Sequence, residues 1–171
     1  RCEDKLHPDV KEKIALFCDV PTDAVFSNPD VEDIYHVPLM VEDEGLDEYV
    51  MEQLGLAERA LPAEERDNRW RELVTQETTG EVDIALVGKY DLEDAYMSVN
   101  EALKHAGLEK GVDVNIRWVD SDKEDVTDSE NLTEADGVVV PGGFGSRGTQ
   151  GKIEAIRYAR EHDVPFLGLC L

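Results

Sequence analysis

The residue best suited to covalent chemistry is a cysteine that follows an apolar run. Cys170 comes directly after Phe166-Leu167-Gly168-Leu169, a run typical of a buried β-strand. A glycine two residues before a nucleophile fits the tight strand-to-helix turn called a nucleophile elbow, where a side chain would clash. A thiol in that position can attack a carbonyl carbon. A buried cysteine at a strand end gives the same short pattern, so the Gly-x-Cys pattern alone leaves both interpretations open.

A glycine-rich loop earlier in the chain bears on this choice. The apolar run 137–140 is followed by Pro141-Gly142-Gly143-Phe144-Gly145 and then by Arg147 and Gly148. Glycines after a strand let backbone N–H groups face a bound oxygen, as in an oxyanion hole. A plain turn or a phosphate cradle would also use glycines, although the loop matches neither common phosphate-binding pattern. A cysteine and such a loop at neighbouring strand ends indicate acyl transfer through a thioester.

The elements around these motifs predict an α/β fold. We expect helices at 95–106 and 151–161 between apolar strands at 82–87, 112–119, 137–140 and 164–169. This alternation predicts a parallel sheet with helices on both faces. Ligands of such sheets bind at the carboxyl ends of the strands, where both motifs would lie.

The first third of the chain has a different pattern. We expect a helix from Pro8, a short strand at 24–26, a helix that Pro38 interrupts, and an amphipathic helix that ends at Gly55. The highly charged segment 58–80 is typical of a connector and contains one helix. The sequence therefore predicts two folded parts with a linker between them.

The composition excludes several classes of function. The chain has 171 residues, with 40 acidic against 17 basic side chains and a formal net charge of −23. Such a surface repels nucleic acid and anionic membranes, and it resembles that of proteins adapted to high salt. The three cysteines are too dispersed for a disulfide framework, and no secretory signal or long apolar run is present. We expect a cytoplasmic protein and, because the chain begins with Arg1, a piece of a longer one.

Several motifs together resemble a known family. Pro141-Gly142-Gly143-Phe144-Gly145, followed by Pro165-Phe166-Leu167-Gly168-Leu169-Cys170-Leu171, resembles the class I glutamine amidotransferases. The Gly-Phe-Gly-x-Arg-Gly extension and the segments 13–20, 86–90 and 94–105 narrow the resemblance to the CTP synthases. It covers nearly the whole chain.

The resemblance implies a domain plan and an activity. Residues 1–57 would be the C-terminal part of a P-loop-type α/β synthetase domain, 58–80 the interdomain linker, and 81–171 the incomplete first half of a class I glutaminase domain. CTP synthases use ATP and Mg²⁺ to aminate UTP to CTP with ammonia released from glutamine. GTP activates the glutaminase step, CTP inhibits, and the family works as a homotetramer.

Roles carry over only to matching positions. By resemblance, Cys170 is the nucleophile, and Gly142, Gly143 and Leu171 form the oxyanion and glutamine-binding positions. Lys13 would contact UTP or CTP, and Pro29, Asp30 and Val31 would lie near ATP. Phe144, Arg147 and Gly148 would fall in the GTP-responsive loop.

The resemblance also implies that several residues needed for activity lie outside this chain. The His and Glu of the triad, the P-loop and the Mg²⁺ ligands are expected outside this chain, so no metal site is expected within it, and none of its four histidines matches the family's base. We therefore expect activity from the intact protein alone. Another amidotransferase subunit is disfavoured because those usually lack the region 13–20. The alternative from a different class is a catalytically inactive binding or filament-interface module with the same fold.

Overall fold

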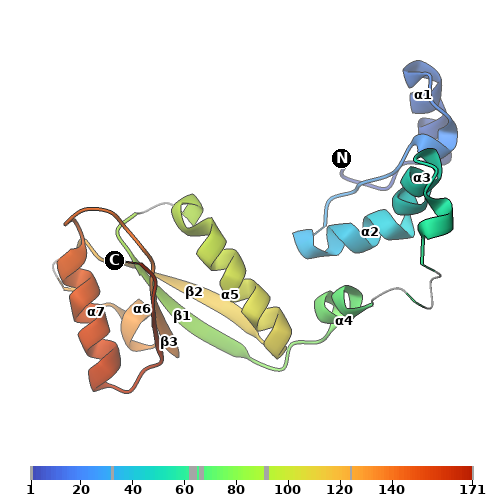
Figure 1. Cartoon of the computed structure of the whole chain (residues 1–171). Coiled ribbons are helices and arrows are strands. Elements are labelled where there is room, and N and C mark those ends of the chain that lie inside the picture. Colours follow the sequence, from blue (N-terminus) through green and yellow to red (C-terminus); the bar gives the residue numbers. More distant parts are fainter. Residues whose placement is uncertain are drawn as a thin grey trace. The chain divides into compact units, whose positions relative to one another are not determined.

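The computed structural model describes residues 2–31, 33–61, 65, 68–90, 93–123 and 125–170. The chain divides into two compact units, Arg1–Thr75 and Gln76–Leu171 (Figure 1). The proposed oxyanion residue Leu171 lies outside the described residues. The three-part division with a linker at 58–80 stays a prediction.

The second unit is built on a four-stranded parallel sheet. Its strands are β1 (Glu81–Gly88), β2 (Asp113–Asp120), β3 (Gly137–Val140) and β4 (Phe166–Gly168), in the order β2-β1-β3-β4. After β2, the chain crosses β1 to continue on its other side. The connections therefore leave β1 and β3 in opposite directions, and open parallel sheets bind ligands at such a point.

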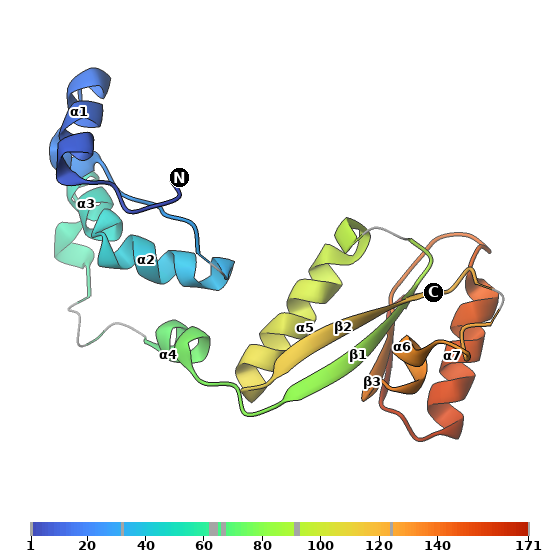
Figure 2. The same cartoon turned by 180° about the vertical axis from the view of Figure 1, so that it is seen from behind.

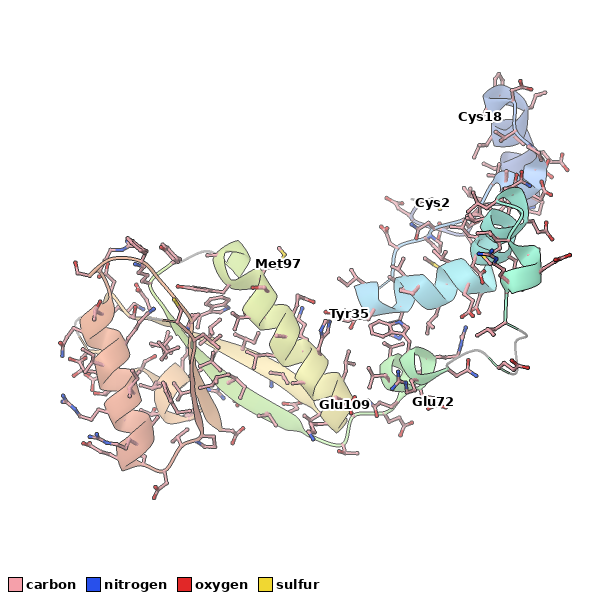
Figure 3. All side chains as sticks on the ribbon, viewed as in Figure 1. Cys2, Cys18, Tyr35, Glu72, Met97 and Glu109 are labelled. Carbon is pink, nitrogen blue, oxygen red and sulfur yellow. The ribbon has the colours of Figure 1, made fainter. Side chains whose placement is uncertain are left out.

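Helices cover both faces of this sheet, as predicted. Helix α5 (Met97–Lys110), preceded by the short helix η5 (Glu93–Tyr96), covers one face; α6 (Glu130–Thr133) and α7 (Thr149–Glu161) cover the other (Figures 1 and 2). In Figure 3, the labelled Met97 and Glu109 mark the two ends of α5.

The alternation of β1 explains why both faces are apolar. Ala85 and Val87 pack in a buried cluster with Ala155 and Ala159 of α7. Leu86 lies in a second cluster, against which side chains of α5 pack. Successive strand residues point to opposite faces, so a run of apolar residues supplies both clusters.

The first unit is helical in its described part. It contains α1 (Pro8–Cys18), η1 (Thr22–Ala24), η2 (Ile34–His36), α2 (Val37–Asp43), α3 (Leu46–Gln53), η3 (Ala57–Arg59) and α4 (Arg69–Thr75). The helix expected in the charged segment is α4, which buries Val74. None of the helices in the described ranges is long and apolar enough to cross a bilayer.

A carboxylate joins three parts of this unit. Glu44 follows α2, and its side chain is only 8% exposed. Its two oxygens accept from Lys11 Nζ at 2.7 Å, from Lys5 Nζ at 2.5 Å and from the Ser27 backbone N–H at 3.1 Å. These interactions, led by the hydrogen bond from Lys11, lower the pKa of Glu44 to about 2. The carboxylate therefore holds α1 against the loop around Ser27.

Two local predictions for this unit are wrong. The segment expected as a strand at 24–26 begins inside the η1 turn, which includes Ala24 and is closed by a hydrogen bond from Val25 N–H to Thr22 O. Local hydrogen bonds thus satisfy its backbone in place of a strand partner. Pro38 does not interrupt a helix but lies in the first turn of α2. A missing N–H costs little there, because first-turn N–H groups have no partner within the helix.

Candidate functional site

The loops that follow the four strands meet at the carboxyl edge of the sheet. Lys89 follows β1, Ser121 follows β2, Pro141 and Gly142 follow β3, and Cys170 comes shortly after β4. Parallel strands bring their carboxyl ends to one edge, so residues far apart in sequence are placed together. This edge contains the motifs singled out from the sequence.

Cys170 has an unusual backbone conformation. Its φ is +62°, in the left-handed region that residues other than glycine rarely adopt. Such a conformation costs on the order of 1–2 kcal/mol, and it persists where the surrounding fold enforces it. The thiol lies on an exposed residue. This geometry fits the strained turn of a nucleophile elbow, while the role of Cys170 as a nucleophile stays a prediction.

Gly142 lies directly against this cysteine. A methyl group built on Gly142 would lie 2.9 Å from Cys170 Cβ and 3.5 Å from its Sγ. The shorter distance is closer than real Cβ atoms approach one another, so only glycine fits without a shift. The structure thus brings together two residues that the sequence analysis assigned to one site.

Two lysines hold the loop that contains the glycines. Lys152, in the first turns of α7, donates from Nζ to Pro141 O at 2.7 Å. Lys89, only 5% exposed, donates from Nζ to Phe144 O. A methyl group on Gly143 would lie 2.8 Å from Lys89 Cε and 3.3 Å from Lys152 Nζ. The loop from Pro141 to Phe144 is therefore bound at both ends by ammonium groups.

The charges at this edge interact with one another. Burial lowers the pKa of Lys152, and repulsion from Lys89 lowers it further, whereas attraction to Cys170 acts in the opposite direction. The Lys152 ammonium is thus electrostatically coupled both to the other lysine and to the candidate nucleophile.

The residues expected in the effector loop lie beside Lys89. Arg147 donates from Nη2 to Lys89 O at 2.8 Å, and its Nη1 lies 3.9 Å from Asp122 Oδ2. Phe144 is 98% exposed. Gly148 has a φ of +71°, and a methyl group there would collide with Ser121 Oγ. The loop therefore runs from the glycines beside Cys170 to an exposed aromatic ring and a guanidinium.

The residues expected to bind UTP and ATP belong to the first unit. Lys13 is an exposed residue of α1. Pro29 forms a β-bridge with Cys2, which Figure 3 labels, and Asp30 N–H donates to Cys2 O at 3.0 Å. Val31 is half-buried. In the ranges that the structure describes, no group of three His, Cys, Asp or Glu side chains could hold a metal ion.

The hydrogen bond from Lys152 to Pro141 was not predicted from the sequence. No motif signals it, because a lysine near the start of an amphipathic helix is ordinary surface composition. The only available clue was its position just after the glycine-rich loop, within reach of the preceding strand end.

Comparison with protein families gives two matches. Residues 91–171 match the model described as glutamine amidotransferase class-I, and residues 1–56 match the one described as CTP synthase N-terminus. Together the two matches lie on either side of the charged segment.

Individual relatives match the chain along its length. It is 76% identical over 171 residues to the CTP synthase of Haloarcula hispanica and 55% identical over 174 residues to that of Archaeoglobus fulgidus. These alignments cover 100% and 99% of this chain but 31% of each relative, so the chain spans about a third of their length. A solved Trypanosoma brucei CTPS glutaminase domain with bound acivicin is 37% identical, with a TM-score of 0.44 over 53% of this chain and 36% of that one.

Proposed function

Because the chain belongs to the CTP synthase family, we propose that it is the part of such an enzyme in which the synthetase domain ends and the glutaminase domain begins. The intact enzyme would use ATP to aminate UTP to CTP with ammonia from glutamine, as a cytoplasmic homotetramer that CTP inhibits. The observation that carries the glutaminase assignment is Cys170, held at φ +62° against Gly142 at the carboxyl edge of the sheet.

The cysteine would perform the first covalent step of glutamine hydrolysis. Its thiolate sulfur forms a bond to the carboxamide carbon of glutamine, and the C=O π pair moves to the oxygen. Backbone N–H groups of Gly142, Gly143 and Leu171 would stabilise that oxyanion. When the C=O bond re-forms, the C–N bond breaks and ammonia leaves with a proton from the imidazole of the family's triad. Water then hydrolyses the thioester to glutamate and the free thiol.

The first unit would contribute to nucleotide binding. An exposed lysine such as Lys13 can pair with nucleotide phosphates as a point charge, and the extended Pro29-Asp30-Val31 segment would border ATP. Mg²⁺ bound to the nucleotide would neutralise phosphate charge. The described residues offer it no cluster of ligands.

The loop that follows Gly142 and Gly143 would respond to GTP, the activator of the family. Phe144 presents an exposed ring, and Arg147 presents a guanidinium, both in the loop at the carboxyl edge of the sheet. A guanine nucleotide offers a base for stacking and phosphates for a guanidinium. We therefore assign Phe144, Arg147 and Gly148 to the response to GTP.

Replacing the cysteine in the full-length enzyme tests the function. Cys170→Ala should abolish glutamine-dependent CTP formation and leave ammonia-dependent formation within about twofold, because the amination chemistry does not need the thiol. Cys18→Ala, at an exposed cysteine of α1, is the matched control and should retain both activities.

The other outcomes separate the alternatives. Loss of both activities in Cys170→Ala would refute the assigned role. If the unaltered full-length protein forms CTP from ammonia but never from glutamine, the second unit would be a catalytically inactive module.

A further inference from the structure

A side chain of α7 holds the peptide that precedes the candidate oxyanion loop. Lys152 lies in the first turns of this helix, and its Nζ donates to Pro141 O at 2.7 Å. Pro141 is buried at the end of β3, and the next residue is the glycine that touches Cys170. The Lys152 ammonium is therefore bound to the residue that directly precedes the glycine packed against Cys170.

The geometry of the peptide bond makes this contact directional. In a trans peptide, the C=O and the following N–H point in opposite directions within one plane, and no cis peptide occurs in the described ranges. Holding Pro141 O toward Lys152 thus fixes the plane that carries the Gly142 N–H. Glycine has the freest backbone of all residues, so an external contact is needed to keep these peptides in one orientation.

A second lysine makes this restraint two-sided. Lys89, from the end of β1, binds Phe144 O on the far side of Gly143. Lys89 is less suitable for a test, because its Nζ binds the carbonyl of Phe144, a residue assigned to the effector loop, so that a change of this side chain would disturb that loop as well. The Lys152 side chain binds Pro141 O instead, and the bond from its backbone N–H to Gly148 O at 3.2 Å does not depend on the side chain.

The charge at this point is not cancelled. Lys89 and Cys170 face Lys152 from the ends of β1 and β4, and the nearby Arg147 is paired with Asp122. Among the residues that the structure describes, neither lysine forms an ion pair with a carboxylate. The Lys152 ammonium, which is coupled to Cys170, suits a step in which negative charge develops on a substrate oxygen.

We propose that Lys152 is a positioning residue of the glutaminase site, which orients the Pro141–Gly142 peptide beside Cys170 and supplies a nearby positive charge as the oxyanion forms. This inference rests on the proposed function. It concerns the rate of the covalent step rather than the binding of glutamine, since the hydrogen bond of the Lys152 ammonium is with the backbone of the loop.

The test compares three variants of the full-length enzyme. Lys152→Met keeps the length of the side chain but removes the donor and the charge, and Lys152→Arg keeps both. Lys104→Met is the matched control, because Lys104 lies on α5 and pairs with Glu101 at 3.2 Å. Each variant is assayed for CTP formation with glutamine and with ammonia, and kcat and KM for glutamine are measured separately.

We expect Lys152→Met to lower kcat with glutamine about 10- to 100-fold, comparable with or below the loss of one oxyanion donor, with KM changed less than threefold. Ammonia-dependent activity should stay within twofold, Lys152→Arg should recover at least a third of kcat, and Lys104→Met should resemble the unaltered enzyme.

Two results would overturn the inference: an unchanged kcat in Lys152→Met, or a parallel fall of both activities. Failure of the proposed function itself is a different result, in which the unaltered enzyme forms no CTP from glutamine or Cys170→Ala retains that activity.

Discussion

Gly142 and Cys170 approach each other so closely that a methyl group on the glycine would lie 2.9 Å from the Cβ of the cysteine. The contact joins Cys170, the second residue after β4, to the loop after β3, across the edge where the two strands end. Backbone packed this closely beside a candidate nucleophile could present N–H donors to an oxygen on the carbon that the nucleophile attacks. Any side chain at Gly142 would therefore displace either the loop or the thiol.

The first prediction concerns this contact. Gly142→Ala in the full-length enzyme should lower glutamine-dependent CTP formation at least about 100-fold, because a displacement of about 1 Å can cost that much. Gly80→Ala is the control, since a methyl group there meets nothing within 4 Å and its backbone is not left-handed. Ammonia-dependent formation should survive in both variants. Normal glutaminase rates in Gly142→Ala would show that the loop can move without consequence.

The second prediction concerns the stability of the first unit. The pKa of Glu44 falls from 4.5 to about 2, first because of the hydrogen bond from Lys11 and then because of that from Lys5. A lowered carboxylate pKa stabilises the fold above the unfolded pKa, and the benefit disappears as pH falls through the folded one. Glu44→Gln should therefore cost on the order of 1–3 kcal/mol at pH 7.

The pH dependence supplies the check on that assignment. The difference in unfolding free energy between the unaltered protein and Glu44→Gln should be full above about pH 5 and shrink as pH falls from 4.5 toward 2. Glu12→Gln, at an exposed position of α1, is the control and should cost less than about 0.5 kcal/mol. A difference independent of pH would mean that packing, rather than charge, makes Glu44 important.

The third prediction concerns salt. With a net charge of −23, self-repulsion opposes the compact state, and salt screens it. The melting temperature should rise by about 5 °C or more as the concentration of a chloride salt increases from tens of millimolar. Most of the rise should occur below about 1 M, because at that concentration the Debye length has already fallen to about 3 Å. A melting curve insensitive to salt up to multimolar concentration would contradict the view that this surface is adapted to high salt.

The fourth prediction concerns the nucleotide site. Lys13→Ala should raise the KM for UTP at least about tenfold with either nitrogen source, because the lost ion pair does not involve the ammonia supply. Glu12→Ala, at the neighbouring exposed position of the same helix, should leave that KM within about twofold. A KM for UTP unaffected by Lys13→Ala would remove this residue from the proposed site.

Some of the fold could be predicted from the chain because the signal is local. Apolar runs such as 137–140 are buried and pair in parallel, and turn residues bound them closely. The prediction failed at Pro38 and at 24–26, where one short pattern is compatible with more than one local structure. At 24–26 the hydrogen bond from Val25 N–H to Thr22 O replaces a strand partner, and at Pro38 the first turn of α2 tolerates a residue without an N–H.

The candidate site also separates what the sequence predicts from what only the tertiary structure decides. The sequence indicated Cys170 and the glycine loop only in combination, because each motif alone also fits a buried cysteine or a plain turn, and the resemblance to the class I glutamine amidotransferases favoured the catalytic interpretation. Three features were visible only in the tertiary structure. They are the contact between Gly142 and Cys170, the left-handed backbone of the cysteine, and the hydrogen bond from Lys152 to Pro141. They depend on the strand order β2-β1-β3-β4, which places the ends of β3 and β4 side by side. Residue types report which chemistry is available, whereas distances between distant segments depend on how the whole sheet is paired.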